Sequence, residues 1–401
     1  MERVPVVVVG AGQAGLAVSH ELTRLGMEHV VLERGRVGQT WRDRWDSFCL
    51  VTPNWTVQLP GGAYDGPDPD GFMPRDEIVR FLDRYAAGFA APVREGVDVD
   101  GVDRGGDGFV LRTSVGGLRA DAVVVATGTY RTPHLPEAAG AFPDHVLRLT
   151  ADDYRAPDTL PEGAVLVVGS GQSGCQIAEE LHDAGREVVL ACGRAPWSPR
   201  RVGDRDFVWW LSETGFLDAS VDSLPGPEAR LFANVLATGR GGGHDLHLRV
   251  LRDAGVTLAG RLTGVDGSSA RFAPDLADCV AWGDERHRQL ADLFHGLARQ
   301  RGLDLELPEP EPFDATAPES VDLRGFGTVV FTTGFRPDYA SWLPWPEAFD
   351  PLGFPLHDEG ASTAVPELYF IGTHFLRKRK SSLLIGVGED AAIVAQRIAA
   401  G

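Results

Sequence analysis

The sequence predicts an α/β fold with two Rossmann-like dinucleotide-binding domains, each with three layers (ββα). Two glycine motifs are the basis of this prediction: Gly10-Ala11-Gly12-Gln13-Ala14-Gly15 and Gly169-Ser170-Gly171-Gln172-Ser173-Gly174. Each motif follows an apolar run typical of a β-strand and opens a segment with helical periodicity. Such glycines let a dinucleotide pyrophosphate approach the backbone at a helix N-terminus. Two motifs in the same context indicate two dinucleotide sites in one chain.

The first unit is predicted to bind FAD. The apolar strand Val4–Val9 precedes its glycines, and the helix Ala14–Leu25 follows them. The next strand, His29–Leu32, ends at Glu33, which lies 23 residues after Gly10. A carboxylate at this position accepts hydrogen bonds from a ribose 2′-hydroxyl, as the adenosine half of FAD requires.

The second unit is predicted to bind NADP(H). Its strand is Ala164–Val168 and its helix is Ser173–Ala184, but Cys192 occupies the position of the carboxylate and is followed by Gly193-Arg194. A carboxylate would repel a 2′-phosphate, whereas a guanidinium forms charge-assisted hydrogen bonds with it. We therefore expect Arg194 to bind the 2′-phosphate with help from Arg200. A solvated surface role for Arg194 stays open.

Strands that lead to a glycine recur along the chain. An apolar run from Asp121 ends in Ala126-Thr127-Gly128, and Thr328–Gly334 repeats this pattern. A third such strand, Glu367–Gly372, precedes a final helix expected over residues 388–399. The simplest topology is an FAD domain made from both ends of the chain and interrupted by an inserted NADP(H) domain.

These boundaries give an FAD domain of residues 1–155 and 319–401 and an NADP(H) domain of residues 156–318. Within the FAD domain, Val97–Val115 is predicted to form short antiparallel strands. Apolar residues at helical spacing predict a helix over Phe72–Ala87.

Composition narrows the classes of partner. The net charge of −19 over 401 residues argues against nucleic acid or an anionic membrane as the main partner. The four cysteines form no C-x-x-C pair, so we expect neither a redox dithiol nor a metal site. No apolar run approaches the roughly 18 residues of a membrane span. We expect a cytoplasmic protein and leave a homodimer open.

Several short motifs outside the glycine turns add a family resemblance. They are Val37-Gly38-Gln39-Thr40-Trp41, Thr333-Gly334-Phe335, Ile371-Gly372-Thr373, Arg205–Trp210, Gly242–Leu246 and Lys378–Asp390. With the two glycine motifs, they resemble the class B, single-component FAD- and NADPH-dependent flavoprotein monooxygenases. The likeness is to the flavin-containing monooxygenases and, most nearly, to an uncharacterised bacterial flavoprotein branch. It covers nearly the whole chain.

The resemblance implies a reaction. NADPH reduces FAD, the reduced flavin binds dioxygen as a C4a-(hydro)peroxyflavin, and one oxygen passes to a nitrogen, sulfur or carbonyl centre of a small-molecule substrate. The cofactor supplies this chemistry, and the protein orients the partners and excludes water.

One segment departs from the family pattern. The family has an F-x-G-x-x-x-H signature before the second unit, but here Asp144 replaces the glycine and Arg148 the histidine. This difference keeps an alternative open, an NADPH oxidase or flavin-dependent reductase without productive oxygen transfer. A non-catalytic FAD-binding protein is a third hypothesis.

Two residues are expected near the reacting atoms. Trp41 is expected to pack on the flavin ring, with a core tryptophan as the alternative. Asn54 and Thr52 lie where related enzymes place polar residues that touch both cofactors, although a structural Asn54 beside Pro53 stays open. The other implied cofactor contacts beyond the glycine motifs and strand ends are Arg34, Gln39, Thr40 and Leu384.

The loop Arg377–Lys380 has two interpretations. It is either a solvated basic loop or a clamp for the NADP(H) phosphate or an acidic substrate.

Overall fold

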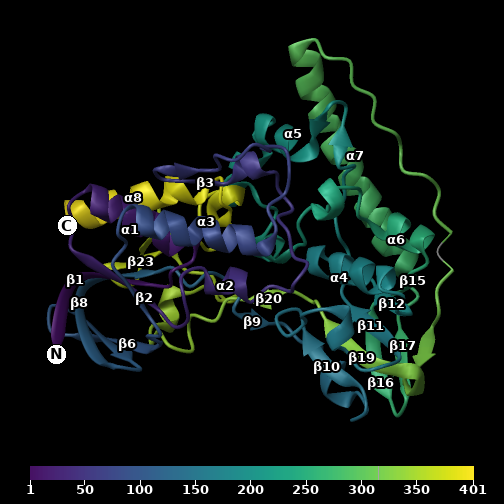
Figure 1. The fold of residues 1–401 in the computed structure, drawn as a ribbon, viewed down its shortest axis with the longest axis horizontal. Coiled ribbons are helices and arrows are strands. Elements are labelled where there is room, and N and C mark those ends of the chain that lie inside the picture. The colour runs from purple at the N-terminus through teal and green to yellow at the C-terminus, as the bar shows by residue number, and fades with distance from the viewer. Residues whose placement is uncertain (315) are drawn as a thin grey trace.

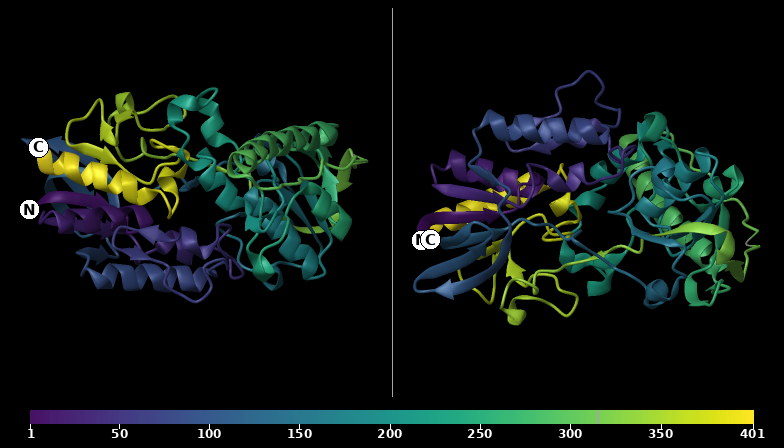
Figure 2. Two further views of the ribbon diagram at one scale, coloured as in Figure 1. Left: turned by 90° about the horizontal axis from the view of Figure 1, so that it is seen from above. Right: turned by 60° about the horizontal axis from the view of Figure 1, so that its bottom comes forward.

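The computed structural model describes residues 1–314 and 316–401 and shows two α/β lobes side by side (Figure 1). The N- and C-termini lie together at the far end of one lobe in all views (Figures 1 and 2). The chain therefore leaves the first lobe, builds the second and returns, which confirms the predicted insertion.

The first lobe is built on a sheet with the strand order β21-β22-β23-β8-β1-β2-β5, and the β6–β7 hairpin continues from β8. The neighbours β23, β8, β1, β2 and β5 run parallel. The strands are β1 (Glu2–Val9), β2 (His29–Glu33), β5 (Val93–Glu95), β6 (Val99–Gly105), β7 (Gly108–Thr113), β8 (Gly116–Val125), β21 (His357–Asp358), β22 (Ala361–Ser362) and β23 (Leu368–Phe370).

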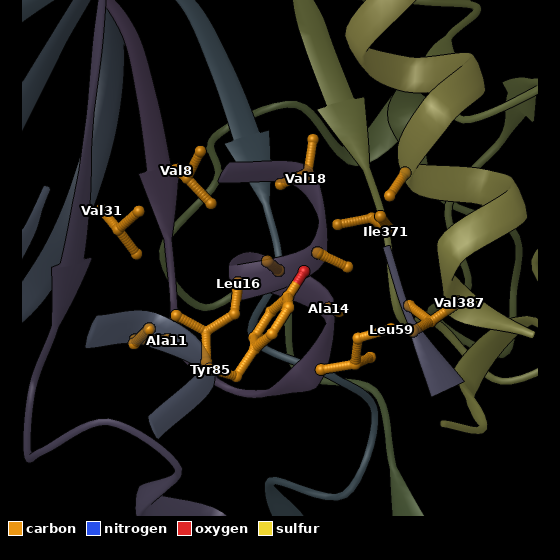
Figure 3. Packing of buried hydrophobic residues seen from close by; sticks show 14 of the residues in the cluster. Val8, Ala11, Ala14, Leu16, Val18, Val31, Leu59, Tyr85, Ile371 and Val387 are labelled. Carbon is orange, nitrogen blue, oxygen red and sulfur yellow. The ribbon is translucent and has the colours of Figure 1, made fainter. Parts of the chain in front are cut away.

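Both faces of this sheet are buried, and the alternation along β1 shows it. Val6 and Val8 belong to the core under the helices, whereas Val7 and Val9 belong to the core on the opposite face. Successive side chains of a strand point to opposite faces, so a run of valines serves both cores. Figure 3 shows Val8 packed with Leu16 on the helix side.

Three helices cover the first of these faces (Figure 1). They are α1 (Gln13–Arg24), α3 (Arg75–Gly88) and α8 (Val387–Ala400), with the short α2 (Gln39–Arg42) beside them. The helix predicted from Phe72 begins at Arg75 instead. Pro74 disfavours helical backbone at the residue before it, so Phe72 stays outside the helix.

The second lobe has a parallel sheet with the strand order β10-β19-β11-β12-β15. Its strands are β10 (Leu147–Thr150), β11 (Ala164–Val168), β12 (Val188–Ala191), β15 (Thr257–Ala259) and β19 (Phe326–Phe331). Its helices are α4 (Gln172–Asp183), α5 (Phe207–Glu213), α6 (Leu248–Ala254) and α7 (Leu276–Arg301). A separate antiparallel sheet joins β16 (Leu262–Asp266), β17 (Ser269–Phe272) and β18 (Ser320–Asp322).

The second sheet extends beyond both of the expected domain boundaries. β10 lies before residue 156 and β19 lies after residue 318, yet both pair within this sheet. A strand belongs to the sheet in which its backbone finds hydrogen-bond partners, and local sequence does not show which sheet that is.

An antiparallel ribbon crosses between the lobes. It pairs β9 (Thr132–Pro133), which follows β8, with β20 (Phe335–Arg336), which follows β19. Figure 1 shows the ribbon between the two sheets.

Candidate functional site

The carboxyl ends of both parallel sheets face one cleft of about 690 Å³. From the first lobe, Thr129 and Tyr130 follow β8 and His374 follows β23. From the second lobe, Gly169–Ser173 follow β11 and Arg194 follows β12. Open α/β sheets bind their ligands at the carboxyl ends of the strands. The cleft is therefore the candidate site.

The first glycine motif forms a cradle beside the end of β8. Gly10 has φ +106°, and a Cβ there would lie 2.8 Å from the carbonyl oxygen of Ala126. A Cβ at Gly15 would overlap the carbonyl oxygen of Gly10. In contrast, a Cβ at Gly12 would meet nothing within 4 Å. The outer glycines thus allow the turn and the helix packing, and the middle one leaves open space above the backbone.

The second motif repeats this geometry. Gly169 has φ +107°, and a Cβ there would lie 2.7 Å from the carbonyl oxygen of Thr332. A Cβ at Gly174 would overlap the carbonyl oxygen of Gly169, while one at Gly171 would meet only the Cβ of Ala233, at 3.8 Å. Both cradles therefore fit a dinucleotide pyrophosphate that approaches the middle glycine.

Glu33 closes the first cradle. Its Oε2 accepts a hydrogen bond from the backbone N–H of Ala11 at 2.8 Å, and its Oε1 accepts one from Gly35 at 2.9 Å. The residue is 7% exposed. Each carboxylate oxygen accepts more than one hydrogen bond, so capacity for a ribose hydroxyl remains.

The second cradle is closed without a carboxylate. The Ser170 hydroxyl donates to the carbonyl oxygen of Gly193 at 3.0 Å and accepts from its N–H at 2.9 Å. Burial raises the pKa of the neighbouring Cys192 thiol well above its usual range, so the thiol is neutral. The strand end that carries a negative charge in the first unit carries none here.

Two arginines lie at this neutral strand end. Arg194 is exposed, lines the cleft and makes neither a hydrogen bond nor an ion pair with any described residue. Arg261 also lines the cleft, and its Nε lies 2.5 Å from Asp275. Arg261 was not among the residues predicted from the sequence. It lies two residues after β15, so the expectation that ligands bind at strand ends would have found it.

Arg200 does not lie where the sequence analysis placed it. The residue is 2% exposed, and its side chain pairs with Asp206 at 2.6 Å. Its Nη1 donates to the carbonyl oxygen of Val51 at 2.7 Å, and its guanidinium lies 4.1 Å from the ring centroid of Phe72. Arg200 is not among the cleft residues. It joins the two lobes, and this geometry does not favour the predicted phosphate role.

Trp41 lines the cleft at the edge of the first cradle. Its indole N–H donates to Oε1 of Gln13 at 3.0 Å, and the Gln13 amide donates to the carbonyl oxygen of Ser382 at 3.2 Å. The ring packs against Phe48, with 5.9 Å between centroids. Trp41 is therefore a half-buried wall residue oriented by the glycine motif itself.

Asn54 is used by its own loop. Its amide N–H donates to the carbonyl oxygen of Asp68 at 2.9 Å, and its amide oxygen accepts from the backbone N–H of Met73 at 2.7 Å. The residue is 5% exposed and does not line the cleft. This geometry favours the structural alternative over a catalytic role. Thr52 likewise accepts a hydrogen bond from the Thr56 hydroxyl at 2.8 Å.

The remaining residues predicted to contact the cofactors differ in their hydrogen bonds and in their burial. Gln39 bonds within its own loop, because its amide donates to Asp43 at 2.8 Å. Gln172 exchanges hydrogen bonds with the backbone of Ala237. Arg34, Thr40 and Gly334 are exposed, Thr127, Gly128 and Ser173 are half-buried, and Ala14, Ala126, Gly372 and Leu384 are buried.

The ends of β8 and β23 are fixed to each other. The Tyr339 hydroxyl donates to the carbonyl oxygen of Gly128 at 3.1 Å and lies 3.0 Å from the hydroxyl of Thr373. Next to these positions, the rings of Tyr130 and His374 lie 6.3 Å apart. Burial, helped by nearby positive charge, lowers the pKa of His374 to about 4. The imidazole is therefore neutral at physiological pH.

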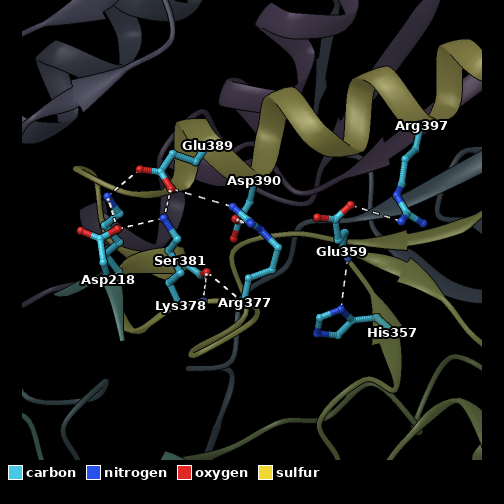
Figure 4. A network of polar contacts seen from close by, with 11 residues as sticks. Asp218, His357, Glu359, Arg377, Lys378, Ser381, Glu389, Asp390 and Arg397 are labelled. Atoms are coloured by element: carbon cyan, nitrogen blue, oxygen red, sulfur yellow. Dashed lines mark hydrogen bonds and ion pairs between the residues drawn. The ribbon is translucent and has the colours of Figure 1, made fainter. Parts of the chain in front are cut away.

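The loop Arg377–Lys380 pairs within the molecule. Lys378 lies 2.9 Å from both Asp218 and Glu389, and Lys380 lies 2.9 and 2.5 Å from the same two carboxylates (Figure 4). None of this loop lines the cleft. The lysines are paired with carboxylates, which supports neither a solvated loop nor a phosphate clamp. Because Asp218 belongs to the inserted segment, the loop connects that segment to α8.

The segment that departs from the family signature lies outside the cleft. Asp144 and Arg148 are both exposed, and neither is a cleft residue. Phe142 packs against Phe331 and His145 contacts the carbonyl oxygen of Leu323 at 3.1 Å. The segment serves the edge of the second sheet.

Metal ligands, cysteines and membrane-spanning helices were also sought among the described residues. Within residues 1–314 and 316–401, no group of three His, Cys, Asp or Glu side chains is arranged to hold a metal ion. The four cysteines are free and buried. No described helix has both the length and the apolar character to cross a membrane.

Comparison with known proteins agrees with this geometry. Residues 7–214, which contain both glycine motifs, match the family described as pyridine nucleotide-disulphide oxidoreductase. The chain is 31% identical over 390 residues to "Uncharacterized oxidoreductase CzcO-like" of Geobacillus kaustophilus (strain HTA426), which covers 97% of this chain and 96% of that one. The chain belongs to the pyridine nucleotide-disulphide oxidoreductase family.

Members named as monooxygenases are among the similar proteins. The chain is 34% identical over 205 residues to indole-3-pyruvate monooxygenase YUCCA4 of Oryza sativa subsp. japonica, across 46% of each chain. Its fold superposes on a flavin-containing monooxygenase from Stenotrophomonas maltophilia with a TM-score of 0.69 and 22% identity, over 100% of this chain and 99% of that one. The predicted resemblance to flavin-containing monooxygenases is confirmed.

Family membership and the two cradles together identify the chain as an FAD-dependent oxidoreductase with FAD and NADP(H) as cofactors. The cofactor prediction is confirmed. The family name includes disulphide chemistry, but this chain has no C-x-x-C pair.

Proposed function

We propose that this pyridine nucleotide-disulphide oxidoreductase is an NADPH-dependent FAD monooxygenase. It oxidises NADPH and transfers one atom of dioxygen to a nitrogen, sulfur or carbonyl centre of a small molecule. The observation that carries the proposal is that one cleft is lined both by the second cradle and by Trp41, which is hydrogen-bonded to Gln13 of the first cradle. Hydride transfer needs two rings in contact, and a shared cleft allows this without passage through solvent.

FAD is assigned to the first cradle. Glu33 is held by two backbone N–H groups and presents its remaining lone pairs to a ribose hydroxyl. The bound FAD supplies the hydride acceptor and the site of oxygen activation. The N-terminus of α8 would hold the flavin pyrimidine, where its dipole would favour negative charge.

NADP(H) is assigned to the second cradle. Arg194 has unfilled donors at the end of β12, and Arg261 adds a second positive charge at the end of β15. The neutral Cys192 takes the position of the carboxylate that would repel a 2′-phosphate. Charge-assisted hydrogen bonds to phosphate are stronger than neutral ones.

Trp41 and Tyr130 form part of the wall of the cleft. Trp41 keeps the role of a flat surface for the flavin ring, because its position is fixed by the Gln13 hydrogen bond. Aromatic walls also exclude water, which protects reactive intermediates. Asn54 is no longer assigned a catalytic role.

Partners and location are parts of the same proposal. The partners are a small-molecule substrate and dioxygen, and four free cysteines support a reducing cytoplasm. A homodimer stays a prediction.

The experiment uses the FAD-loaded enzyme with NADPH, a panel of amines, sulfides and ketones, and ¹⁸O-labelled dioxygen. A monooxygenase gives one labelled oxygen in the product for each NADPH consumed. Stoichiometric hydrogen peroxide without any labelled product would show the oxidase alternative instead.

A further inference from the structure

The two cradles differ in what lies above their middle glycines. A Cβ at Gly12 would meet nothing within 4 Å, whereas a Cβ at Gly171 would lie 3.8 Å from the Cβ of Ala233. That distance is an ordinary van der Waals contact. A phosphate that occupies the space above Gly171 therefore contacts the segment that carries Ala233.

This segment is a strap, residues 225–235, which runs from one lobe to the other. Just before it, the backbone N–H of Val221 donates to the carbonyl oxygen of Arg377 in the first lobe at 2.9 Å. Just after it, the backbone N–H of Leu236 donates to the carbonyl oxygen of Pro196 in the second lobe at 2.8 Å. The strap is therefore held by backbone hydrogen bonds at its two ends.

Between these ends the strap is loosely attached. Within the part of the chain that the structure describes, its backbone hydrogen-bonds only to itself: Ala229 donates to Gly226 at 3.1 Å, and Phe232 donates to Ala229 at 3.3 Å. Residues 230–234 line the cleft. Phe232 is 55% exposed and contacts Trp282 of α7 edge to face, with 6.1 Å between ring centroids. A segment with so few backbone contacts opens more easily than the core.

An ion pair fastens the middle of the strap to the first lobe. Nη1 of Arg230 lies 3.2 Å from Oδ2 of Asp350, and the guanidinium lies 4.9 Å from the ring centroid of Phe354. The carboxylate is fixed, because its Oδ1 accepts hydrogen bonds from the backbone N–H groups of Leu352 at 2.9 Å and Phe354 at 3.0 Å. The side chains of Arg230 and Asp350 are 20% and 14% exposed, so water and salt screen this pair less than a surface pair.

We propose that the strap closes over the pyrophosphate of NADP(H) and that the Arg230–Asp350 pair is the latch that holds it closed. The proposal rests on the assignment of NADP(H) to the second cradle under the proposed function. NADP⁺ leaves and NADPH enters in every turnover, so the latch opens with each exchange. Arg230 and Asp350 are thus positioning residues that set how long the nucleotide stays in the cleft.

The test measures how fast etheno-NADP⁺, a fluorescent analogue, leaves oxidised, FAD-loaded enzyme when excess NADP⁺ is added. Arg230→Gln and Asp350→Asn are each expected to raise the dissociation rate about tenfold, because each removes one charge of the latch. Asp350→Asn keeps an oxygen for the N–H groups of Leu352 and Phe354, so the loop itself stays in place. An unchanged rate in either variant overturns the proposal.

A double variant separates a latch from two independent effects. If each side chain acts only through the other, Arg230→Gln combined with Asp350→Asn exchanges the analogue no faster than either single variant. An additive acceleration of about a hundredfold would overturn the proposal. A direct contact of Arg230 with a nucleotide phosphate predicts slower dissociation in Asp350→Asn, and that result would overturn it as well.

Two further variants serve as controls. Arg271→Gln is matched, because it breaks the exposed pair with Asp266 at 3.3 Å on the antiparallel sheet, and it should leave the dissociation rate unchanged. Arg230→Lys keeps the charge and loses the planar fork, so its rate should lie between those of the wild type and Arg230→Gln. It also covers a folding failure of the glutamine variant, which flavin content would reveal.

Trypsin gives a second readout that needs no turnover. It cleaves after Arg230, and cleavage requires the strap to leave the cleft wall. Saturating NADP⁺ is expected to slow this cut about tenfold or more in the wild type. Without nucleotide, Asp350→Asn should be cut faster than the wild type. The same rate of cutting with and without NADP⁺ overturns the proposal.

Neither measurement involves oxygen. An enzyme that makes only hydrogen peroxide would keep the strap and lose the monooxygenase function. Gly171→Val tests the cradle assignment separately. Loss of etheno-NADP⁺ binding in this variant keeps the assignment even if the latch variants show no effect, whereas binding as in the wild type removes the assignment and the strap proposal together.

Discussion

The two cradles share a backbone and differ in how their second strands end. In the first, the Glu33 carboxylate reaches back to the N–H of Ala11. In the second, Ser170 takes the place of Ala11, and its hydroxyl reaches forward to Gly193. The same contact between turn and strand end is made once with a charge and once without. The backbone of both cradles thus fits a dinucleotide, and we propose that the side chain at the strand end selects which dinucleotide binds.

The largest effects are expected at the middle glycines. Gly12 and Gly171 have φ of −78° and −73° with extended ψ, so a valine fits the backbone but fills the space above it. Gly12→Val should leave the purified protein without flavin. Gly171→Val should retain flavin and raise the KM for NADPH at least a hundredfold. Flavin content and steady-state kinetics measure both.

Gly88→Ala is the matched control for this pair. Gly88 lies in α3, and a Cβ there would meet nothing within 4 Å. It should change neither flavin content nor KM. Full flavin content in Gly12→Val would contradict the assignment of FAD to the first cradle.

The next effect concerns the choice between NADPH and NADH. Arg194→Ala removes donors to the 2′-phosphate, worth about 2 kcal/mol or about thirtyfold in KM for NADPH. The KM for NADH should stay unchanged, since NADH lacks this phosphate. Arg261→Ala should have a smaller effect, because Asp275 already shares its charge. An equal rise in KM for NADPH and NADH in Arg194→Ala would contradict the proposal that Arg194 binds the 2′-phosphate.

A third prediction concerns the contact between the lobes. Asp206→Asn leaves the buried Arg200 without its counter-charge and should lower the free energy of unfolding by about 3 kcal/mol. Asp322→Asn breaks the exposed pair with Arg324 and should cost less than about 1 kcal/mol. Urea unfolding curves of the two variants give the comparison. Similar small losses would mean that Arg200 is not an effective link between the lobes.

The smallest effect is a pH dependence in the second lobe. Burial lowers the pKa of His247 to about 4, and the ring packs 4.4 Å from Trp197. The unfolded chain binds a proton near its ordinary pKa of about 6.5, whereas the folded chain does not. The contribution of this group to stability is therefore complete above about pH 6.5 and is lost as the pH falls toward 4.

His247→Phe keeps a ring against Trp197 and removes the titration. The urea midpoint of this variant should fall less between pH 7 and pH 5 than that of the wild type. Parallel falls would show that other groups cause the acid sensitivity.

The two cradles could be predicted from the sequence because neighbouring residues determine their geometry. A turn that needs a positive φ at Gly10 and space above Gly12 leaves a pattern of neighbouring residues, and the residue after the next strand, Glu33, is at a fixed spacing. The predictions that the structure does not favour concern residues whose partners are distant in the sequence. Arg200 is held by Val51 and Phe72, 149 and 128 residues earlier, and no local pattern reports such partners.

The role of Asn54 and the domain limits likewise depend on contacts between distant segments, which local sequence does not show. The Asn54 amide is occupied by backbone groups of residues 68 and 73, which depends on how one loop folds over another. β10 was not predicted, because its sequence Leu-Arg-Leu-Thr is no apolar run, and the apolar run of β19 does not show its sheet; only pairing assigns both strands to the second sheet. Likewise, the departures Asp144 and Arg148 kept the oxidase or reductase alternative open, but both residues are exposed and neither lines the cleft.

The most direct test of the account mixes FAD-loaded enzyme with NADPH under anaerobic conditions and follows the flavin absorbance. The account predicts rapid loss of the oxidised flavin spectrum with NADPH and much slower loss with NADH at the same concentration. Arg194→Ala should make the two nucleotides similar. An unchanged flavin spectrum in the presence of saturating NADPH would contradict the claim that the cofactors of the two cradles meet in one cleft between the lobes.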